Sequence, residues 1–356
     1  MKIVRVETWR ERVPLTRPYT IASGTTEDVE LFFVRVVGEH EIGLGSGAPT
    51  ELLTGETSDA CAAALTEDRL ARFGGLDANA LGAATALATE LLRATPAARA
   101  AVDMALYDLV TRALGVPLAE FLGRPRAPMP TSITVGIQST ESALAEVDEY
   151  LGRGFRSLKV KIGQSIDEDL ERLRAIRERV GPAIPIRVDA NEGYSLADAV
   201  RLAESLDALA LELVEQPLPA AAPEDLARLP ARMRRVLALD ESVHDEADAF
   251  AHARVPDSCA EYVVKLMKCG GVTPAMSIAR IAEAGGRGLM WGCMDESVIS
   301  IAAALHAAYA SPATRHLDLD GSFDLARDPA EGGFRLVDGE LHLLDRPGLG
   351  VRLRGE

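Results

Sequence analysis

The chain has 356 residues, 26% of them charged, and its 54 acidic residues outnumber the 38 basic ones to give a formal net charge of −16. A surface this negative is not built to neutralise phosphates or anionic lipids, so we expect neither nucleic acid nor a membrane as a partner. The length is sufficient for about two domains or one large barrel, whose core needs no disulfide or structural metal.

The N-terminal third is predicted to combine strands with a long helical region. Residues 1–10 carry scattered charges and no apolar stretch of the kind found in signal peptides, and no later run is long enough to span a membrane. Strand-like segments at 2–9 and 31–37 precede an Ala-rich helical region, whose last helix begins at Pro96 and ends near Gly115.

The glycine-rich stretch and the cysteines of the chain do not match known binding motifs. The glycine-rich stretch 43–47 is interpreted as a turn, because it has neither the spacing of a dinucleotide-binding loop nor a following helix. The four cysteines are far apart in the sequence and form no CxxC pair. Scattered cysteines are typical of reduced thiols, so a cytoplasmic location is expected.

An alternation of strands and helices fills the rest of the chain. The Pro-rich segment 123–130 is interpreted as a linker. Seven short apolar strands separated by amphipathic helices follow, and they predict a parallel sheet closed into a barrel. The turn-rich tail from about Leu317 is expected to pack back on the N-terminal part. The predicted strands cover residues 132–137, 157–162, 184–189, 211–215, 236–240, 262–266 and 288–291.

Charged residues recur at intervals of one strand and one helix through this barrel. The series Lys161, Asp189, Glu215, Asp240 and Lys265 has spacings of 28, 26, 25 and 25 residues. Each residue therefore ends a successive strand, and in a parallel barrel those strand ends meet at the functional rim. The regular spacing predicts that the five side chains form one site.

The three acids of the series predict a metal site. Carboxylates gathered on a partly dry rim repel one another unless a cation neutralises them. Three oxygen ligands that leave positions open for water and substrate suit Mg²⁺, so we expect one Mg²⁺ ion per subunit, held by Asp189, Glu215 and Asp240. The alternative is that each acid pairs with its own Arg or caps the following helix.

The lysines predict proton transfer. The chain has 5 Lys against 33 Arg, and four of these lysines form two pairs, Lys159/Lys161 and Lys265/Lys268. Arg does not release its proton at working pH, whereas a buried Lys can. Lys161 and Lys265 end the second and sixth strands, so they should face each other across the metal. One can remove an α-proton while the other delivers a proton to the opposite face, which inverts the carbon.

The remaining lysine of each pair, Lys159 or Lys268, is expected to have a different role. Lys159 points the same way along its strand as Lys161, and it is expected to lower the pKa of Lys161 while contacting the substrate carboxylate. Lys268 lies just past the strand end and is expected to be a solvated charge.

Five motifs carry a resemblance to a known family. They resemble the motif set of the enolase superfamily, muconate-lactonising subgroup, and the similarity extends over essentially the whole chain. The mandelate-racemase branch is disfavoured because the seventh strand ends in Trp291-Gly-Cys293 and lacks a catalytic His. The motifs are Lys159-Val-Lys161, Asp189-Ala-Asn191, Glu215-Gln-Pro217, Asp240-Glu-Ser242 and Lys265-Leu-Met-Lys-Cys-Gly-Gly271.

The resemblance implies a fold and a mechanism. It implies a modified (β/α)7β TIM-type barrel at about 126–320 and an α+β capping domain at 1–125, which a tail at about 321–356 completes. It implies the same Mg²⁺ ligands and the same lysine acid/base pair, which act through an enediolate, with Lys159 beside them. Asn191 and Glu241 are expected to position the metal ligands without binding the metal themselves.

The subgroup includes several reactions, and one motif discriminates among them. Asp318 and Asp320 face the same way in an extended segment and can receive an ammonium group. They match the Asp-x-Asp motif with which dipeptide epimerases bind the substrate's α-ammonium. We therefore expect an isomerase that inverts the C-terminal residue of L,L-dipeptides. The alternatives are an N-acylamino acid racemase or o-succinylbenzoate synthase, a hydrophobic-dipeptide epimerase, and an inactive relative that acts as a binding protein.

Substrate preference is expected to come from two capping loops and the end of the seventh strand. Around Gly24, small neutral residues occupy the place where epimerases selective for an acidic second residue carry an Arg. Acids lie instead at Glu51 in the second loop and at Asp295 and Glu296 after the seventh strand. Segment 265–324 resembles epimerases that act on cationic dipeptides, so Lys- or Arg-containing substrates are expected. Barrels of this family often assemble, so a homo-oligomer is also expected.

Overall fold

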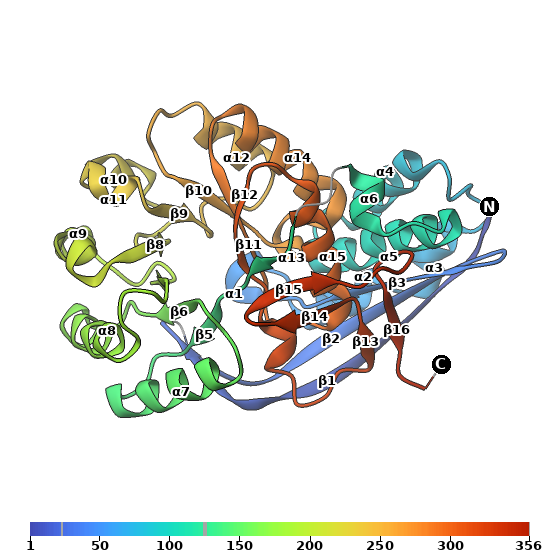
Figure 1. Cartoon of the computed structure of the whole chain (residues 1–356). Coiled ribbons are helices and arrows are strands. Elements are labelled where there is room, and N and C mark those ends of the chain that lie inside the picture. The colour runs from blue at the N-terminus through green and yellow to red at the C-terminus, as the bar shows by residue number, and fades with distance from the viewer. Residues whose placement is uncertain (23, 124–126, 356) are drawn as a thin grey trace.

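The computed structural model of the chain describes residues 1–22, 24–123 and 127–355. An N-terminal part made of an antiparallel sheet and helices lies beside a barrel of parallel strands (Figure 1). The sheet contains β1 (Ile3–Ile21), β2 (Gly24–Gly38) and β3 (Ile42–Gly47). The helices beside it are α1 (Glu51–Thr54), α2 (Ser58–Ala64), α3 (Glu67–Leu70), the 3₁₀ turn η1 (Ala71–Phe73), α4 (Leu81–Leu92), α5 (Pro96–Leu114) and α6 (Leu118–Leu122).

The helix α5 packs directly on β3 because the strand is rich in glycine. A Cβ atom added to Gly45 would overlap the carbonyl oxygen of Ala101, and one on Gly47 would lie 2.6 Å from the carbonyl oxygen of Ala97. Glycine thus allows the strand and helix backbones to approach closely. The interpretation of residues 43–47 as a turn was wrong, because these glycines belong to a buried strand.

Eight parallel strands form the barrel, in the order β12-β11-β10-β9-β8-β7-β6-β5. The two edges of this sheet meet, since the backbone N–H of Ser132 donates to the carbonyl of Leu317 at 3.1 Å. All seven predicted strands are present, and the eighth, β12, includes the start of the predicted tail. The strands are β5 (Ile133–Val135), β6 (Leu158–Lys161), β7 (Ile186–Asp189), β8 (Leu211–Glu215), β9 (Leu237–Leu239), β10 (Glu261–Val264), β11 (Gly288–Gly292) and β12 (Thr314–Asp318).

Helices cover the outside of the barrel and begin at clear sequence signals. Five of them start after a Ser or Asp side chain that accepts a hydrogen bond from a first-turn N–H: Ser139, Ser165, Ser195, Asp245 and Ser297. The helices are α7 (Thr140–Gly152), α8 (Ile166–Val180), α9 (Leu196–Leu209), α10 (Pro223–Arg228), α11 (Ala231–Arg234), α12 (Glu246–Ala253), α13 (Leu266–Cys269), α14 (Val272–Ala284) and α15 (Val298–Ala310).

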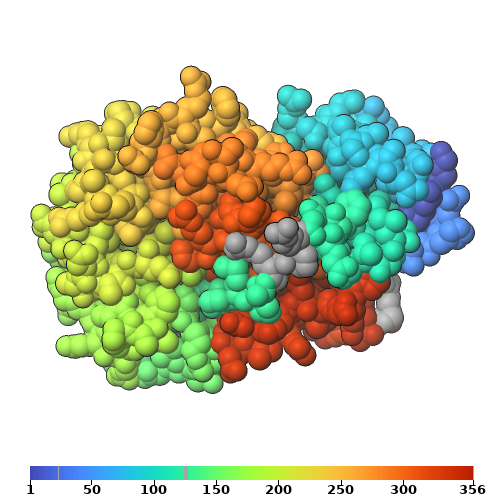
Figure 2. Space-filling view, turned by 45° about the horizontal axis from the view of Figure 1, so that its top comes forward, coloured from blue at the N-terminus to red at the C-terminus, as the bar shows by residue number. Residues whose placement is uncertain are grey.

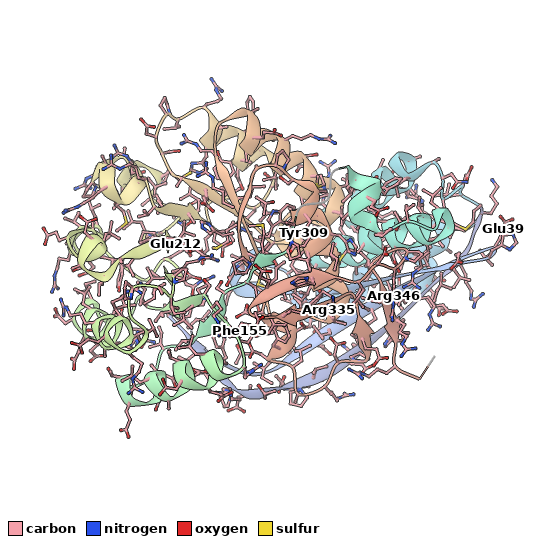
Figure 3. All side chains as sticks on the ribbon, viewed as in Figure 1. Glu39, Phe155, Glu212, Tyr309, Arg335 and Arg346 are labelled. Carbon is pink, nitrogen blue, oxygen red and sulfur yellow. The ribbon has the colours of Figure 1, made fainter. Side chains whose placement is uncertain are left out.

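The C-terminal segment contacts both parts of the molecule. The N–H of Leu118 donates to the carbonyl of Gly348 at 2.9 Å. Phe323 packs edge-on against Phe155, which is labelled in Figure 3, with the ring centroids 5.7 Å apart. On the face in Figure 2, this red segment borders both the teal residues around α6 and green residues near the start of the barrel. Its elements are η2 (Gly321–Phe323), β13 (Ala330–Gly332), β14 (Phe334–Val337), β15 (Glu340–Leu343), which pairs with β4 (Met129–Pro130), and β16 (Val351–Leu353).

The predicted domain boundaries at residues 125 and 320 stay predictions. Part of the predicted linker, residues 124–126, lies outside the described residues. The four cysteines are all free thiols. Within the described ranges, none of the helices combines the length and apolar character that crossing a membrane requires. The expected cytoplasmic location remains a prediction.

Candidate active site

The five residues of the regular series meet at one rim of the barrel. Lys161, Asp189 and Glu215 end β6, β7 and β8 and are aligned across these strands, while Asp240 and Lys265 directly follow β9 and β10. All five side chains are buried. The spacing argument therefore placed these residues correctly, because one strand and one helix return the chain to the same rim.

Lysine ammonium groups lie between the carboxylates of the rim. Lys161 Nζ is 2.6 Å from Asp189 Oδ2, and Lys265 Nζ is 2.7 Å from Asp240 Oδ2. Lys159 Nζ lies 2.7 Å from Glu215 Oε2 and 3.1 Å from Asp189 Oδ2. The side chains that the sequence assigned to proton transfer and to metal binding are thus in direct contact.

These contacts determine the direction in which the lysine pKa values move. Burial lowers the pKa of Lys161, but Asp189 raises it, and the net direction is upward. Lys159 acts in the predicted downward direction and is outweighed. Burial also lowers the pKa of Lys265, whereas Asp240 raises it above its usual value. The carboxylates beside both lysines therefore favour the ammonium form.

Lys268 is a buried structural cation, so the prediction of a solvated charge was wrong. Its Nζ donates to Asp240 Oδ1 at 2.6 Å and to the carbonyl oxygens of Asp240, Val243 and Val263 at 2.7–3.0 Å. The ammonium connects the loop after β9 to β10 and fixes one oxygen of Asp240, while the other oxygen faces Lys265.

The three acids have the donor chemistry for a magnesium ion, although they do not form a compact cluster. Among the described residues, no group of three or more His, Cys, Asp or Glu side chains is arranged to hold a metal ion. Glu215 supports the fit, because its buried Oε1 has no hydrogen-bond partner and its Oε2 is approached by Lys159 Nζ at 2.7 Å. Burial, and then the charge of Asp189, raise the pKa of Glu215 to about 8. A carboxylate short of positive charge suits a hard divalent cation.

Asn191 and Glu241 connect the predicted ligands as expected from their position beside them. Asn191 accepts a hydrogen bond from Lys161 at 3.0 Å, and its own N–H donates to Asp189 at 2.9 Å. Its side-chain amide donates to Glu241 at 3.1 Å. Asn191 has a φ of 41° and Gln216 a φ of 31°, so two strained residues closely follow predicted ligands.

A cavity of about 310 Å³ opens above the rim, between the barrel and the N-terminal part. Asp318, Asp320 and Asp295 line it together with the lysines of the rim. Asp318 accepts hydrogen bonds from Ser132 Oγ at 2.6 Å and from Lys159 at 2.8 Å, and Asp320 accepts one from the N–H of Thr134 at 2.7 Å. Burial, followed by the charge of Asp318, raises the pKa of Asp320 to about 6.

Three predicted substrate residues are not among those that line the cavity. Glu51 and Gly24 are exposed on the two capping loops. Glu296 is buried, and its carboxylate accepts a hydrogen bond from the N–H of Met294 at 2.8 Å. Sequence reasoning also missed several lining residues, among them Tyr19, Leu52, Leu53 and Asp324. The Leu52-Leu53 pair beside Glu51 was a usable signal, because exposed apolar residues in a loop favour a binding role.

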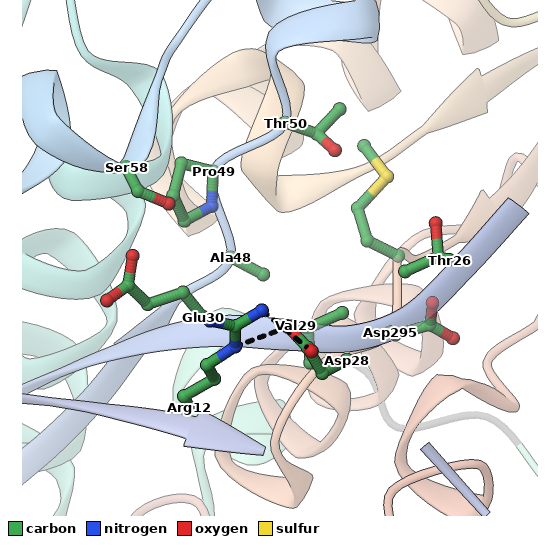
Figure 4. A pocket seen from close by; sticks show the side chains of 11 residues that line it. Arg12, Thr26, Asp28, Val29, Glu30, Ala48, Pro49, Thr50, Ser58 and Asp295 are labelled. Atoms are coloured by element: carbon green, nitrogen blue, oxygen red, sulfur yellow. Dashed lines mark hydrogen bonds and ion pairs between the residues drawn. The ribbon is translucent and has the colours of Figure 1, made fainter. Parts of the chain in front are cut away.

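Asp295 also borders a second cavity of about 450 Å³ (Figure 4). Asp295 and Thr26 lie at one end of this cavity and Ser58 at the other, with the Arg12–Asp28 ion pair along the hairpin (Figure 4). Burial, followed by the charge of Asp320, raises the pKa of Asp295 to about 6. Asp295 is therefore a second carboxylate of the site that is short of a cation.

Comparison with known proteins covers both parts of the chain. Residues 3–123 match the N-terminal domain of mandelate racemase / muconate lactonizing enzyme, and residues 142–356 match the enolase C-terminal domain-like family. The chain is 51% identical to an L-Lys-D/L-Arg epimerase from Methylococcus capsulatus and 45% identical to another from Desulforapulum autotrophicum, over 99% of each chain. It matches a crystal structure of the dipeptide epimerase from Methylococcus capsulatus, complexed with Mg and the dipeptide L-Arg-D-Lys, with a TM-score of 0.97, 50% identity and 99% of both chains covered.

Proposed function

The chain belongs to the mandelate racemase / muconate lactonizing enzyme family of enolase-type proteins, and on that basis we propose that it is a dipeptide epimerase. Its substrates are L,L-dipeptides that contain Lys or Arg, and it inverts the α-carbon of the C-terminal residue. The main support is the pair Lys161 and Lys265, which stand on strands four places apart in an eight-stranded barrel and line one cavity.

The lysine pair supplies the two steps of inversion. β6 and β10 lie on opposite sides of the closed sheet, so an α-carbon between them has one ammonium or amine on each face. One lysine in its neutral form accepts the α-proton, and the other lysine, as an ammonium, donates a proton to the opposite face. After one turnover the two lysines have exchanged protonation states, and the α-carbon has the opposite configuration.

The carboxylates position the substrate and its charge. Mg²⁺, held by Asp189, Glu215 and Asp240, would stabilise the negative charge that the substrate carboxylate gains as the α-proton leaves. Lys159 lies against two of these residues and against Asp318, so it links the metal-binding side of the rim to the substrate side. Asp318 and Asp320 receive the α-ammonium of the N-terminal residue.

The charge of the cavity supports the preference for cationic dipeptides. Asp295, Asp320 and Asp324 all line it, and burial and mutual repulsion raise the pKa of each. A cationic side chain would relieve this repulsion, whereas an acyl group would leave the carboxylates unpaired at a cost. The relatives named L-Lys-D/L-Arg epimerase support the same choice.

One observation favours a second candidate, an epimerase of hydrophobic dipeptides. Ile21, Leu52 and Leu53 line the mouth of the cavity on the side of the N-terminal part. These apolar side chains can cover the carbon stem of a Lys or Arg, but they can equally cover a Leu or Tyr side chain.

A library of dipeptides incubated in D₂O with Mg²⁺ tests the proposal. We expect deuterium at the α-position of the C-terminal residue, detected as a mass increase, with the fastest exchange in Lys- and Arg-containing dipeptides. Exchange confined to apolar or acidic dipeptides would contradict the cationic preference. The Lys265→Ala variant should lose the exchange, and its persistence there would argue against the lysine pair. Light scattering on the same sample tests the proposed homo-oligomer.

A further inference from the structure

The central cavity shares lining residues with a third cavity, which is distinct from the one in Figure 4. This third cavity, of about 370 Å³, lies between the β1 strand and helix α7, and it shares Tyr19, Thr134 and Asp324 with the central one. The hairpin reaches this position because the N–H of Ile137 donates to the carbonyl of Thr20 at 2.9 Å. The central cavity thus adjoins two other cavities, and it shares Asp295 with one and Asp324 with the other.

The Asp324 carboxylate differs from those of Asp318, Asp320 and Glu146. Asp318 and Asp320 accept hydrogen bonds from the barrel, and Glu146 accepts one from Tyr150 at 2.8 Å. Within the described ranges, no donor reaches the carboxylate of Asp324, although its backbone carbonyl accepts from the N–H of Thr16 at 2.7 Å. The backbone of Asp324 is therefore fixed while its side chain is available to a ligand.

The position of Asp324 relates it to the N-terminal residue of a dipeptide. Its largest electrostatic interactions with other side chains are with Asp320 and Asp295, which raise its pKa, and the charge of Arg153 partly offsets them. Asp295 in turn interacts with Asp320 and with Lys161, which faces the α-carbon to be inverted. The proposed ammonium site includes Asp320, so we place Asp324 near the N-terminal residue of the dipeptide. Asp295, which also interacts with Lys161, is placed nearer to the C-terminal residue.

We propose that the cavity between β1 and α7 is the subsite for the side chain of the N-terminal residue, and that Asp324 selects a cationic side chain there. The inference rests on the proposed epimerase function and assigns one half of its specificity. The ring of Tyr19 offers an apolar wall for the carbon stem of Lys or Arg, and the charged end meets the Asp324 carboxylate. The two side chains of the dipeptide would then leave the central cavity in opposite directions.

Three dipeptides and two variants test this assignment. The substrates are Lys-Ala, Ala-Lys and Ala-Ala, each followed by deuterium exchange at the C-terminal residue with Mg²⁺ present. In Asp324→Asn, we expect the preference for Lys-Ala over Ala-Ala, measured as a ratio of kcat/KM, to fall by about tenfold, on the scale of one charged hydrogen bond. The preference for Ala-Lys over Ala-Ala should fall much less. Asp167→Asn, which removes a charge from a side chain that is 79% exposed, is the control for net charge.

The result that overturns the inference is distinct from failure of the proposed function. Loss of both preferences to the same extent, or retention of the Lys-Ala preference in Asp324→Asn, would overturn the subsite assignment alone. Exchange absent from all three dipeptides in the parent chain would overturn the epimerase function and the inference with it. If Asp324→Asn does not fold, the parent chain still decides the matter. Lys-Ala should exceed norleucyl-Ala, which has a similar stem without the charge, and equal rates would refute the assignment.

Discussion

Removing the ammonium of Lys268 should destabilise the whole barrel. The side chain is 1% exposed, and its ammonium lies within hydrogen-bond distance of four acceptor oxygens, two of them on Asp240. Lys268→Met keeps an unbranched side chain of similar size but leaves the Asp240 carboxylate and the carbonyls of Val243 and Val263 without this donor. The substitution therefore tests the charge rather than the packing.

The expected loss can be estimated from these contacts. Breaking a buried ion pair by removing one partner costs about 3–5 kcal/mol. Because Asp240 keeps its contact with Lys265, we expect the lower end, about 3 kcal/mol, in the free energy of unfolding. Lys2→Met is a matched control at an exposed lysine, and it should change the free energy by less than about 0.5 kcal/mol.

Urea unfolding followed by circular dichroism measures both variants. A loss in Lys268→Met no larger than that in Lys2→Met would refute the structural role of Lys268. Calorimetric titration of the folded variant with Mg²⁺ gives a second measurement, because Asp240 loses the donor that fixes one of its oxygens. We expect weaker Mg²⁺ binding than in the parent chain, and unchanged affinity would show that Lys268 does not position Asp240.

Three further predictions concern the interior and the metal. His306 is fully buried and accepts the N–H of Ala119, and burial lowers the pKa of His306 from 6.5 to about 4. As the pH falls from 6.5 to 4, His306 takes up a proton in the unfolded chain before it does so in the folded chain. Lowering the pH from 7 to 5 should therefore reduce the free energy of unfolding by about 2 kcal/mol, and His306→Asn should lack this loss. Equal pH dependence of the two proteins in urea unfolding would contradict the prediction. Gly45→Ala should cost about 3 kcal/mol, since the added Cβ overlaps the Ala101 carbonyl, whereas Gly82→Ala, where the space is open, should be neutral or stabilising. Chelation by EDTA should abolish deuterium exchange and added Mg²⁺ should restore it; exchange that survives dialysis against EDTA would exclude a role for the metal.

The sequence predicted the barrel and its rim because both depend on local periodicity. Each strand-helix unit is of nearly equal length, so the acids and lysines fall at the same end of successive strands, and Lys161 and Asp189 lie side by side as expected. The exclusion of phosphate binding at Gly45 was reasonable, but the local pattern could not reveal that helix α5 lies against it. Close packing between distant segments leaves no periodic signal in either segment.

Lys268 was misassigned, and Glu51 is not among the residues that line the cavity, for a related reason. The acceptors of Lys268 are mainly backbone carbonyls, and the direction of a carbonyl in a loop such as that of Val243 does not depend on residue type. Glu51 begins a single-turn helix, and this turn directs Leu52 and Leu53 rather than Glu51 toward the cavity. Successive residues of a helix point in different directions, so in a short helix one side chain can face the site while the side chain next to it faces solvent.

The acids of the site with raised pKa values fall into two groups, and each group indicates which positive charge is missing. The four lysines of the rim contact Asp189, Glu215, Asp240 and Asp318. Burial and neighbouring acids still raise the pKa of Glu215 to about 8 and that of Glu241 to about 7, on the side where Mg²⁺ is proposed. The same causes raise the pKa of Asp320, Asp295 and Asp324 on the side where the dipeptide is proposed. A metal ion alone would relieve only the first group. The second group requires more than an α-ammonium at Asp320, because it contains three carboxylates, and a dipeptide with a cationic side chain supplies the additional charge.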